Sequence, residues 1–152
     1  MNKIQESNID RSKWGSGPWD KEPDRIEFEH AELPCLMLRQ TSGHWCGYVA
    51  VPPGHLLYGK DYDDVDVDVH GGLTYSEQKK PALDKIVPQD ISLEGLPANV
   101  WWFGFDCAHY MDKTPHLPFF YTFDASLDGI YRDVKYVELE IKKLAEQLKR
   151  LG

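Results

Sequence analysis

Short stretches rich in β-branched, aromatic and aliphatic residues, bounded by glycine, proline or polar residues, recur along the first two thirds of the chain. Such stretches are typical of β-strands. We therefore expect strands at Arg25–Glu29, Leu33–Arg39, Trp45–Val51, Val65–His70 and Val100–Phe105. The polar sequence from Gln40 to His44 is short and contains a glycine, so it predicts a hairpin loop and antiparallel pairing.

The stretch that leads to His70 alternates between valine and aspartate. Alternate residues of a strand point to opposite faces, so the valines from Val65 to Val69 are expected on a buried face. His70 then shares the exposed face with the aspartates from Asp64 to Asp68.

Apolar residues near the C-terminus recur every three or four positions and predict one amphipathic helix over about 127–151. Ser126 or Asp128 is the expected N-cap. The apolar stripe consists of Leu127, Ile130, Val134, Val137, Ile141, Leu144, Leu148 and Leu151. It could dock on the open face of the sheet or form the seam of a homo-oligomer, and we favour docking.

These elements predict a single α+β domain over 14–152, in which the C-terminal helix packs on an antiparallel sheet. Residues 1–13 are polar, carry both signs of charge and are expected to form a separate N-terminal segment. The sequence from Trp14 to Asp24 mixes tryptophan with glycine and proline. We expect it to be an ordered strap whose indoles pack on an edge of the domain.

The chain has 152 residues, with 25 acidic and 17 basic side chains and a net charge of −8. A chain of this length can bury a core without disulfides, and the three cysteines, which lack Cys-x-x-Cys spacing, are expected to be reduced. The negative charge disfavours nonspecific nucleic-acid binding. Because no apolar stretch approaches the roughly 20 residues that span a bilayer, we expect a cytoplasmic protein without a membrane partner.

The first motif that can carry chemistry follows the alternating stretch and reads His-Gly-Gly-Leu-Thr. It places His70 at a strand end and Gly71 and Gly72 in the turn that follows. Glycines adopt backbone conformations that other residues avoid and let a ligand approach the chain closely. We therefore expect His70, Gly71, Gly72 and Thr74 to contact a ligand.

The second motif follows the aromatic strand near residue 105. It carries Asp106, His109 and Asp112 at three-residue steps, which share one face if the turn is helical. Aromatic side chains combined with convergent polar groups are typical of ligand pockets. We therefore expect His109 to join the same site, with Trp101 or Trp102 as its floor.

The two motifs together allow three interpretations. His70, Asp106 and His109 could ligate Zn, Mn or Fe, in which case Asp112 or Asp68 is the candidate catalytic base. The same imidazoles and carboxylates could instead form a general acid–base pair. The third interpretation is structural: Asp106 caps a turn, His109 bonds a backbone carbonyl and the glycines only form a tight turn.

Five ordered motifs resemble a family of small accessory proteins of bacteriophages and prophages. They are Gly17-Pro18-Trp19-Asp20-x-Glu22-Pro23-Asp24, Gly47-Tyr48-Val49-x-Val51-Pro52, His70-Gly71-Gly72-Leu73-Thr74, Trp102-x-Gly104-Phe105-Asp106-Cys107-Ala108-His109, and Tyr131-Arg132-Asp133 leading into Leu144-Ala145-x-Gln147-Leu148. The resemblance extends from about Trp14 to Leu148 and implies a bacterial host cell as the setting. It implies no catalytic residue. Leu56 departs from the family pattern, which has proline after His55.

We therefore expect a phage accessory protein that binds a small, nucleotide-like ligand in a His/Asp/Trp pocket and so counters a host defence. A metal-dependent hydrolase of a phosphoester or nucleotide-type small molecule is the alternative. A second alternative is an inhibitor that binds a host protein through the tryptophan-rich strap or the C-terminal helix.

Overall fold

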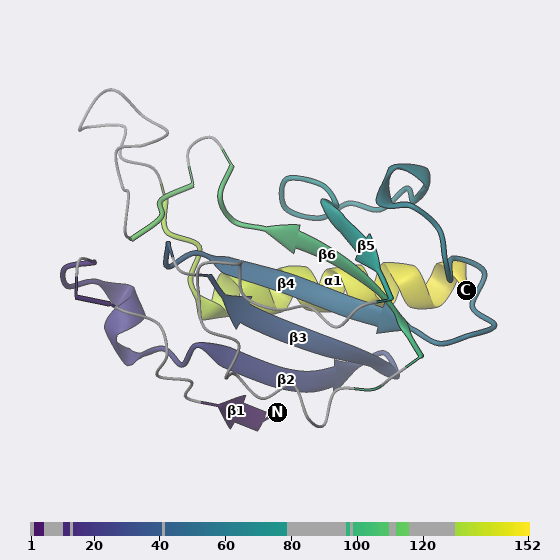
Figure 1. Ribbon diagram of the computed structural model, residues 1–152, viewed down its shortest axis with the longest axis horizontal. Coiled ribbons are helices and arrows are strands. Elements are labelled where there is room, and N and C mark those ends of the chain that lie inside the picture. Colours follow the sequence, from purple (N-terminus) through teal and green to yellow (C-terminus); the bar gives the residue numbers. More distant parts are fainter. Residues whose placement is uncertain are drawn as a thin grey trace.

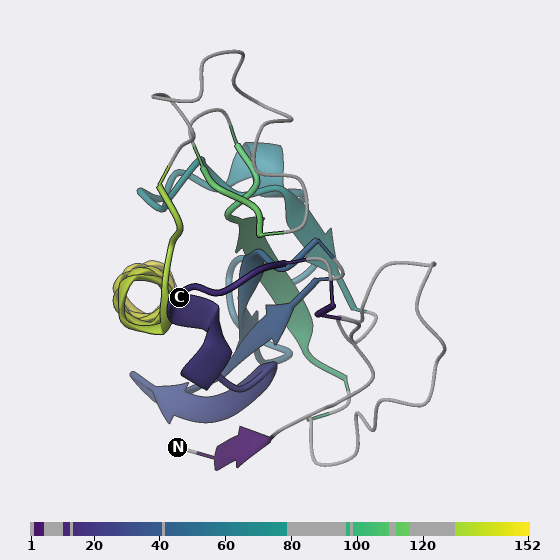
Figure 2. The same cartoon turned by 90° about the vertical axis from the view of Figure 1, so that its left-hand side faces the viewer.

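The computed structural model describes residues 2–4, 11–12, 14–40, 42–78, 97, 99–109, 112–115 and 130–152. Its strands form one antiparallel sheet in the order β1-β2-β3-β4-β6-β5, and α1 lies along one face of this sheet (Figure 1). The elements are β1 (Asn2–Ile4), η1 (Pro18–Lys21), β2 (Arg25–His30), β3 (Leu33–Arg39), β4 (Trp45–Val51), η2 (Tyr62–Asp64), β5 (Tyr75–Glu77), β6 (Trp101–Asp106) and α1 (Val134–Leu151). Figure 2 shows α1 end-on, on one side of the sheet. The expected α+β fold is confirmed.

The expected hairpin joins β3 to β4. The backbone N–H of Gln40 donates to the carbonyl of His44, and that of Gly43 donates to the carbonyl of Gln40, both at 2.9 Å. The sequence did not indicate β1 and β5, which are only three residues long. β1 pairs with β2, so residues 2–4 form an edge of the sheet.

The valine–aspartate stretch over 65–70 is not a strand, which corrects the prediction. The alternation itself is real, because its first and last valines are buried and its aspartates are exposed. Its backbone, however, bonds to side chains of α1. Gln147 accepts from the N–H of Asp68 (2.7 Å) and donates to its carbonyl (2.8 Å), and Glu140 accepts from the N–H of His70 (2.7 Å). An alternating pattern indicates that every second side chain is buried. It does not show whether the backbone forms its hydrogen bonds with a neighbouring strand or with side chains.

The helix begins at Val134, later than the sequence indicated. Asp133 has an extended backbone and its carboxylate accepts from the N–H of Tyr136 (2.9 Å), which makes it the N-cap. Ile130, although it fits the stripe, lies before the helix, is exposed and takes part in an isolated bridge. The earlier predicted positions fall outside the described residues: Ser126, Leu127 and Asp128.

The apolar stripe of α1 docks on the sheet. Its buried members are Val137, Ile141, Leu144, Ala145 and Leu148. Gly47 of β4 lies beneath it, and a Cβ there would come within 2.7 Å of Ile141 and 2.6 Å of Phe105. The missing side chain therefore lets the helix approach the sheet closely. A homo-oligomer formed through α1 would need this same apolar stripe, which here packs on the sheet.

The side chain of His55 contacts the C-terminal end of α1. Its Nδ1 accepts from the backbone N–H of Leu57 (3.0 Å), so the ring proton is on Nε2, which donates to the carbonyl of Leu148 (2.8 Å). This contact satisfies one of the carbonyls that a helix end leaves without an intrahelical partner.

The face of the sheet opposite α1 carries a second apolar cluster, to which the strap contributes. Trp14 and Trp19 of the strap are buried there, together with Leu36, Leu38, Cys46, Tyr48, Ala50, Val100 and Trp102. The prediction of an ordered strap with packed indoles is confirmed. The described residues include no helix with the length and hydropathy needed to span a bilayer.

Candidate functional site

The two loops that carry the predicted motifs meet beside the first turns of α1. The rings of His70 and His109 are 5.9 Å apart between centroids and are inclined by 65°. Around them lie the other members of what we call the paired-histidine cluster: Asp106, Asp112, Arg132 and Tyr136. The structure thus brings together His70, Asp106 and His109, as the sequence led us to expect, and it adds Arg132 and Tyr136.

His70 is the inner imidazole of the cluster, with a side chain only 11% exposed. Its Nε2 lies 2.7 Å from Asp112 Oδ2 and its Nδ1 lies 2.8 Å from the hydroxyl oxygen of Tyr136. Burial and the Glu140 carboxylate raise the pKa of Tyr136, so this hydroxyl keeps its proton at neutral pH and can donate to Nδ1. When Tyr136 is the donor, Nε2 carries the ring proton and donates to Asp112. Both nitrogens of His70 are therefore engaged within the protein.

Asp112 is the buried carboxylate that connects the two loops, with a side chain only 1% exposed. Its Oδ2 accepts from His70 Nε2 and from the backbone N–H of His109 (3.1 Å), and its Oδ1 accepts from Arg132 Nε (2.9 Å). A buried carboxylate is stable only when paired and hydrogen-bonded, as it is here. Asp112 was a candidate base, but its lone pairs serve to hold the cluster together.

His109 is the outer imidazole, and its side chain is 35% exposed. Its Nε2 lies 3.3 Å from Asp106 Oδ1, within ion-pair distance; this nitrogen is itself buried and makes no hydrogen bond to the described residues. Asp106 also accepts from the N–H of Ala108 (3.1 Å) and from the hydroxyl of Thr74 (3.3 Å). The exposed part of the ring therefore does not include Nε2, and the imidazole can donate a hydrogen bond to a ligand or exchange a proton with it through its other nitrogen, Nδ1.

The paired glycines have different tasks. Gly71 has a φ of +68°, and a Cβ built there would overlap the imidazole of His109. Gly72 has a φ of +80°, its N–H donates to the carbonyl of Val69 (2.9 Å), and a Cβ there would meet nothing within 4 Å. The absence of a side chain at Gly71 therefore lets the His109 ring pack directly against the backbone. The backbone hydrogen bond of Gly72 completes the turn, and the space that a Cβ there would occupy is open.

Three predicted residues do not join the cluster. Trp101 is at the opposite end of β6 from Asp106 and donates to the carbonyl of Lys60 (2.9 Å). Trp102 is buried in the apolar cluster on the other face of the sheet. The side chain of Asp68 is 91% exposed and lies 3.7 Å from Lys143. Neither a tryptophan floor nor a base at residue 68 is therefore formed at this site.

The described residues contain no group of three or more His, Cys, Asp or Glu side chains arranged to hold a metal ion. The physical reason lies in His70, whose two ring nitrogens are already bonded to Asp112 and Tyr136. The Zn, Mn or Fe site expected from His70, Asp106 and His109 is thus not supported by this geometry.

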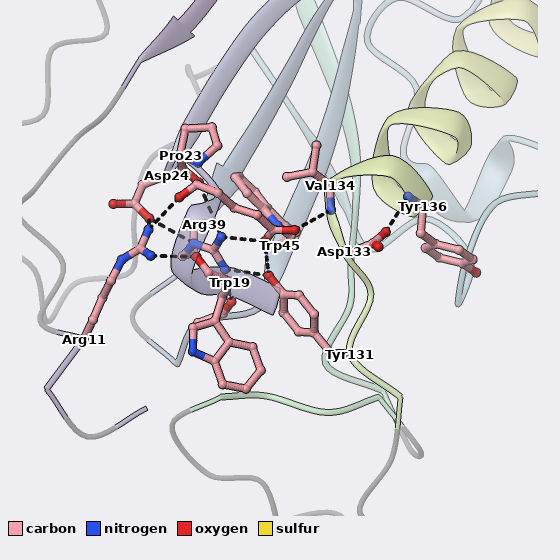
Figure 3. Close-up of polar contacts among 12 residues, drawn as sticks. Arg11, Trp19, Pro23, Asp24, Arg39, Trp45, Tyr131, Asp133, Val134 and Tyr136 are labelled. Atoms are coloured by element: carbon pink, nitrogen blue, oxygen red, sulfur yellow. Dashed lines mark hydrogen bonds and ion pairs between the residues drawn. The ribbon is translucent and has the colours of Figure 1, made fainter. Parts of the chain in front are cut away.

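A second polar network centres on Arg39, whose side chain is fully buried (Figure 3). Its Nε donates to Asp24 Oδ1 and its Nη2 to Glu22 Oε1, each at 2.9 Å, and its Nη1 donates to the hydroxyl of Tyr131 (2.9 Å). The guanidinium also lies 4.3 Å from the ring centroid of Trp45. We call these five residues the Arg39 network.

The sequence analysis did not identify the Arg39 network. Two signals for it were present: an arginine that ends an otherwise apolar strand, and two carboxylates on either side of Pro23 in the strap. Buried arginines require carboxylate partners, so these two signals belong together. Their pairing over 15 and 17 positions is a tertiary contact that no local pattern shows.

The described cysteines are free and buried. Burial raises the pKa of Cys35 to about 12, and it raises the pKa of Cys107 further. Thiols in this state are not nucleophilic near neutral pH, so they are packing residues.

No protein-family model matches the chain, and no curated protein or solved structure matches it either. The resemblance to phage accessory proteins therefore remains an expectation based on the five sequence motifs. The chemistry of the paired-histidine cluster is what indicates a function.

Proposed function

We propose that this chain binds a small, nucleotide-like ligand at the paired-histidine cluster, with His109 as the residue that contacts the ligand. The single observation that carries this proposal is that His70 from one loop meets Asp106, His109 and Asp112 from another, which forms one buried and one partly exposed histidine–carboxylate pair. A phage accessory protein that captures a host signalling nucleotide is the biological setting that we propose for it.

The two imidazoles differ in exposure and hydrogen bonding, and this difference favours His109 as the residue that contacts the ligand. His70 has both nitrogens bonded to protein groups and is nearly covered, whereas His109 is about one third exposed. A residue whose hydrogen bonds are all satisfied holds its neighbours in place, and one with an accessible edge can recognise a ligand.

The class of ligand follows from the groups around His109. The imidazole and the partly exposed guanidinium of Arg132 can donate to phosphate or ribose oxygens, and the hydroxyl of Thr74, whose proton is donated to Asp106, can accept from a ribose hydroxyl. The turn at Gly72 borders open space, which leaves room for a ligand near the backbone. The net charge of −8 disfavours a long polyanion but not one small molecule that meets several local donors.

The pair of imidazoles also favours a second candidate function, hydrolysis of the bound phosphoester. His109 could exchange a proton with the attacking water or the leaving group through Nδ1, the ring nitrogen that is not directed at Asp106. His70 would remain a positioning residue, because its ring is already bonded on both sides.

Isothermal titration calorimetry with a panel of cyclic and linear nucleotides tests the proposal. We expect at least one nucleotide to bind the wild-type protein, and we expect His109→Asn to weaken this binding at least about tenfold. His30→Gln is the matched control, because His30 is also partly exposed and paired with a carboxylate, Glu146, but belongs to β2. Absence of heat with every nucleotide, or equal losses in both variants, would contradict the proposal. Release of phosphate or opening of a cyclic nucleotide during the titration would identify hydrolysis.

A further inference from the structure

Residues 131–136 join two polar networks whose motifs are far apart in the sequence. The start of this segment contacts the Arg39 network through Tyr131, and its later residues contact the paired-histidine cluster through Arg132 and Tyr136. Figure 3 shows Tyr131 beside the buried guanidinium, and Val134 and Tyr136 at the start of α1. The segment is therefore restrained from both sides.

Glu22 of the strap holds the first part of this segment at two points. Its Oε2 accepts from the backbone N–H of Val134 (3.0 Å), the first residue of α1, and its Oε1 accepts from the hydroxyl of Tyr131. The same Oε1 accepts from Arg39 (2.9 Å) and from the indole of Trp45 (3.3 Å), which fix the carboxylate in turn. A carboxylate at a helix N-terminus is favoured both by the free N–H groups and by the helix dipole.

The later part of the segment reaches the candidate site directly. Arg132 donates to Asp112 (2.9 Å), and its guanidinium lies 4.8 Å from the ring centroid of Tyr136. The Tyr136 hydroxyl bonds to His70, and the N-cap carboxylate of Asp133 holds the Tyr136 backbone. A shift in the start of α1 would thus move the partners of Asp112 and His70 at the same time.

We infer that Glu22 is a positioning residue for the paired-histidine cluster, acting through residues 131–136. It fixes the beginning of α1, and the beginning of α1 fixes the two side chains that orient Asp112 and His70. This assigns a role to the Gly-Pro-Trp-Asp-Lys-Glu-Pro-Asp motif beyond packing: the strap sets the geometry of a site to which it contributes no ligand contact. The inference rests on the proposed function only in treating that cluster as the ligand site.

A merely stabilising role predicts something different. Asp24 also accepts from Arg39 (2.9 Å) and is buried, but among the described residues it has no hydrogen bond to 131–136. If Glu22 only stabilises the strap, loss of either carboxylate has the same consequences. If Glu22 positions the site, only its loss changes the environment of His70.

The test compares Glu22→Gln with Asp24→Asn in protein carrying ¹³C-labelled histidine rings. We expect both variants to unfold at a lower temperature than the wild type. Only Glu22→Gln should shift the ring resonances of His70 and His109, because the Asp112 carboxylate is then held less closely against His70. Asp24→Asn should leave both histidines as in the wild type.

Tyr131→Phe removes one hydroxyl from the same contact and decides the question if Glu22→Gln does not fold. It should shift the His70 resonances in the same direction by a smaller amount. Unchanged His70 and His109 resonances in the folded variant, with only a lower unfolding temperature, would overturn the inference. Because the measurement needs no ligand, it can succeed even if no nucleotide binds, and the two proposals can therefore fail separately.

Discussion

Alanine at Gly71 perturbs the paired-histidine cluster at one point, and the neighbouring Gly72 supplies a matched control. Both glycines have positive φ values, +68° and +80°, so an alanine at either position is strained. Only at Gly71 would the added Cβ overlap a neighbour, the imidazole of His109. The two substitutions therefore share the backbone effect and differ in the effect on His109.

The expected magnitudes follow from this geometry. A left-handed conformation costs a residue with a Cβ roughly 1–2 kcal/mol, so both alanine variants should lose about that much free energy of unfolding. The clash at Gly71 is with a side chain, which can rotate away, and His109 is expected to swing off the turn instead of forcing the backbone apart. We therefore expect Gly71→Ala to weaken nucleotide binding at least about tenfold, equivalent to roughly 1.4 kcal/mol, and Gly72→Ala to change it about twofold at most.

Urea denaturation measures the first quantity, and calorimetry with the best nucleotide measures the second. The histidine ring spectrum adds a direct check, because the His109 resonances should move in Gly71→Ala and stay in place in Gly72→Ala. If both variants bind equally well and show the same His109 resonances, Gly71 does not support His109 and the description of the site is incorrect.

Four further predictions concern stability and reactivity. Asp112→Ala should lower the free energy of unfolding by about 3–5 kcal/mol in urea denaturation, because it leaves buried donors without their carboxylate; a loss below about 1 kcal/mol would contradict that role. Cys35 and Cys107 should not react with a thiol reagent at pH 8 until the protein is unfolded, and a fast native reaction would show that burial does not raise the thiol pKa. For the same reason the free energy of unfolding should begin to fall above about pH 8 and continue to fall as the pH rises toward 12, since the unfolded chain releases protons that the buried thiols retain; urea midpoints at pH 7, 9 and 10 measure this. His55→Ala should accelerate amide hydrogen exchange in the last turn of α1 and cost about 1 kcal/mol, and unchanged exchange there would show that the contact with Leu148 does not hold the helix end.

The strands and the helix could be predicted where a local pattern determines the structure. The runs that became β2, β3, β4 and β6 have both the residue types and the flanking turns of strands. The stretch over 65–70 shows the limit of that reasoning, because alternate burial beside α1 has the same period as a strand. The start of the helix shows a second limit of local patterns. Ile130 fits the apolar stripe, but the N-cap at Asp133 determines where the helix begins.

The candidate site could be predicted in part. Two motifs that end in polar groups suggested that His70, Asp106 and His109 meet, and they lie together. The partners Tyr136 and Arg132 could not be found in the same way, because they come from the start of a helix whose first residue the sequence misplaced. The sequence also could not distinguish the two faces of β6, which is why Trp102 was expected at the site and lies in the apolar cluster of the opposite face.

The most direct test of the central claim follows the His109 ring during a nucleotide titration. In a ¹H–¹³C spectrum of histidine-labelled protein, the account predicts that the His109 resonances shift in a saturable way while those of His30 and His55 stay fixed. A nucleotide that binds, as judged by calorimetry, without moving His109 would contradict the claim that this imidazole is the contact.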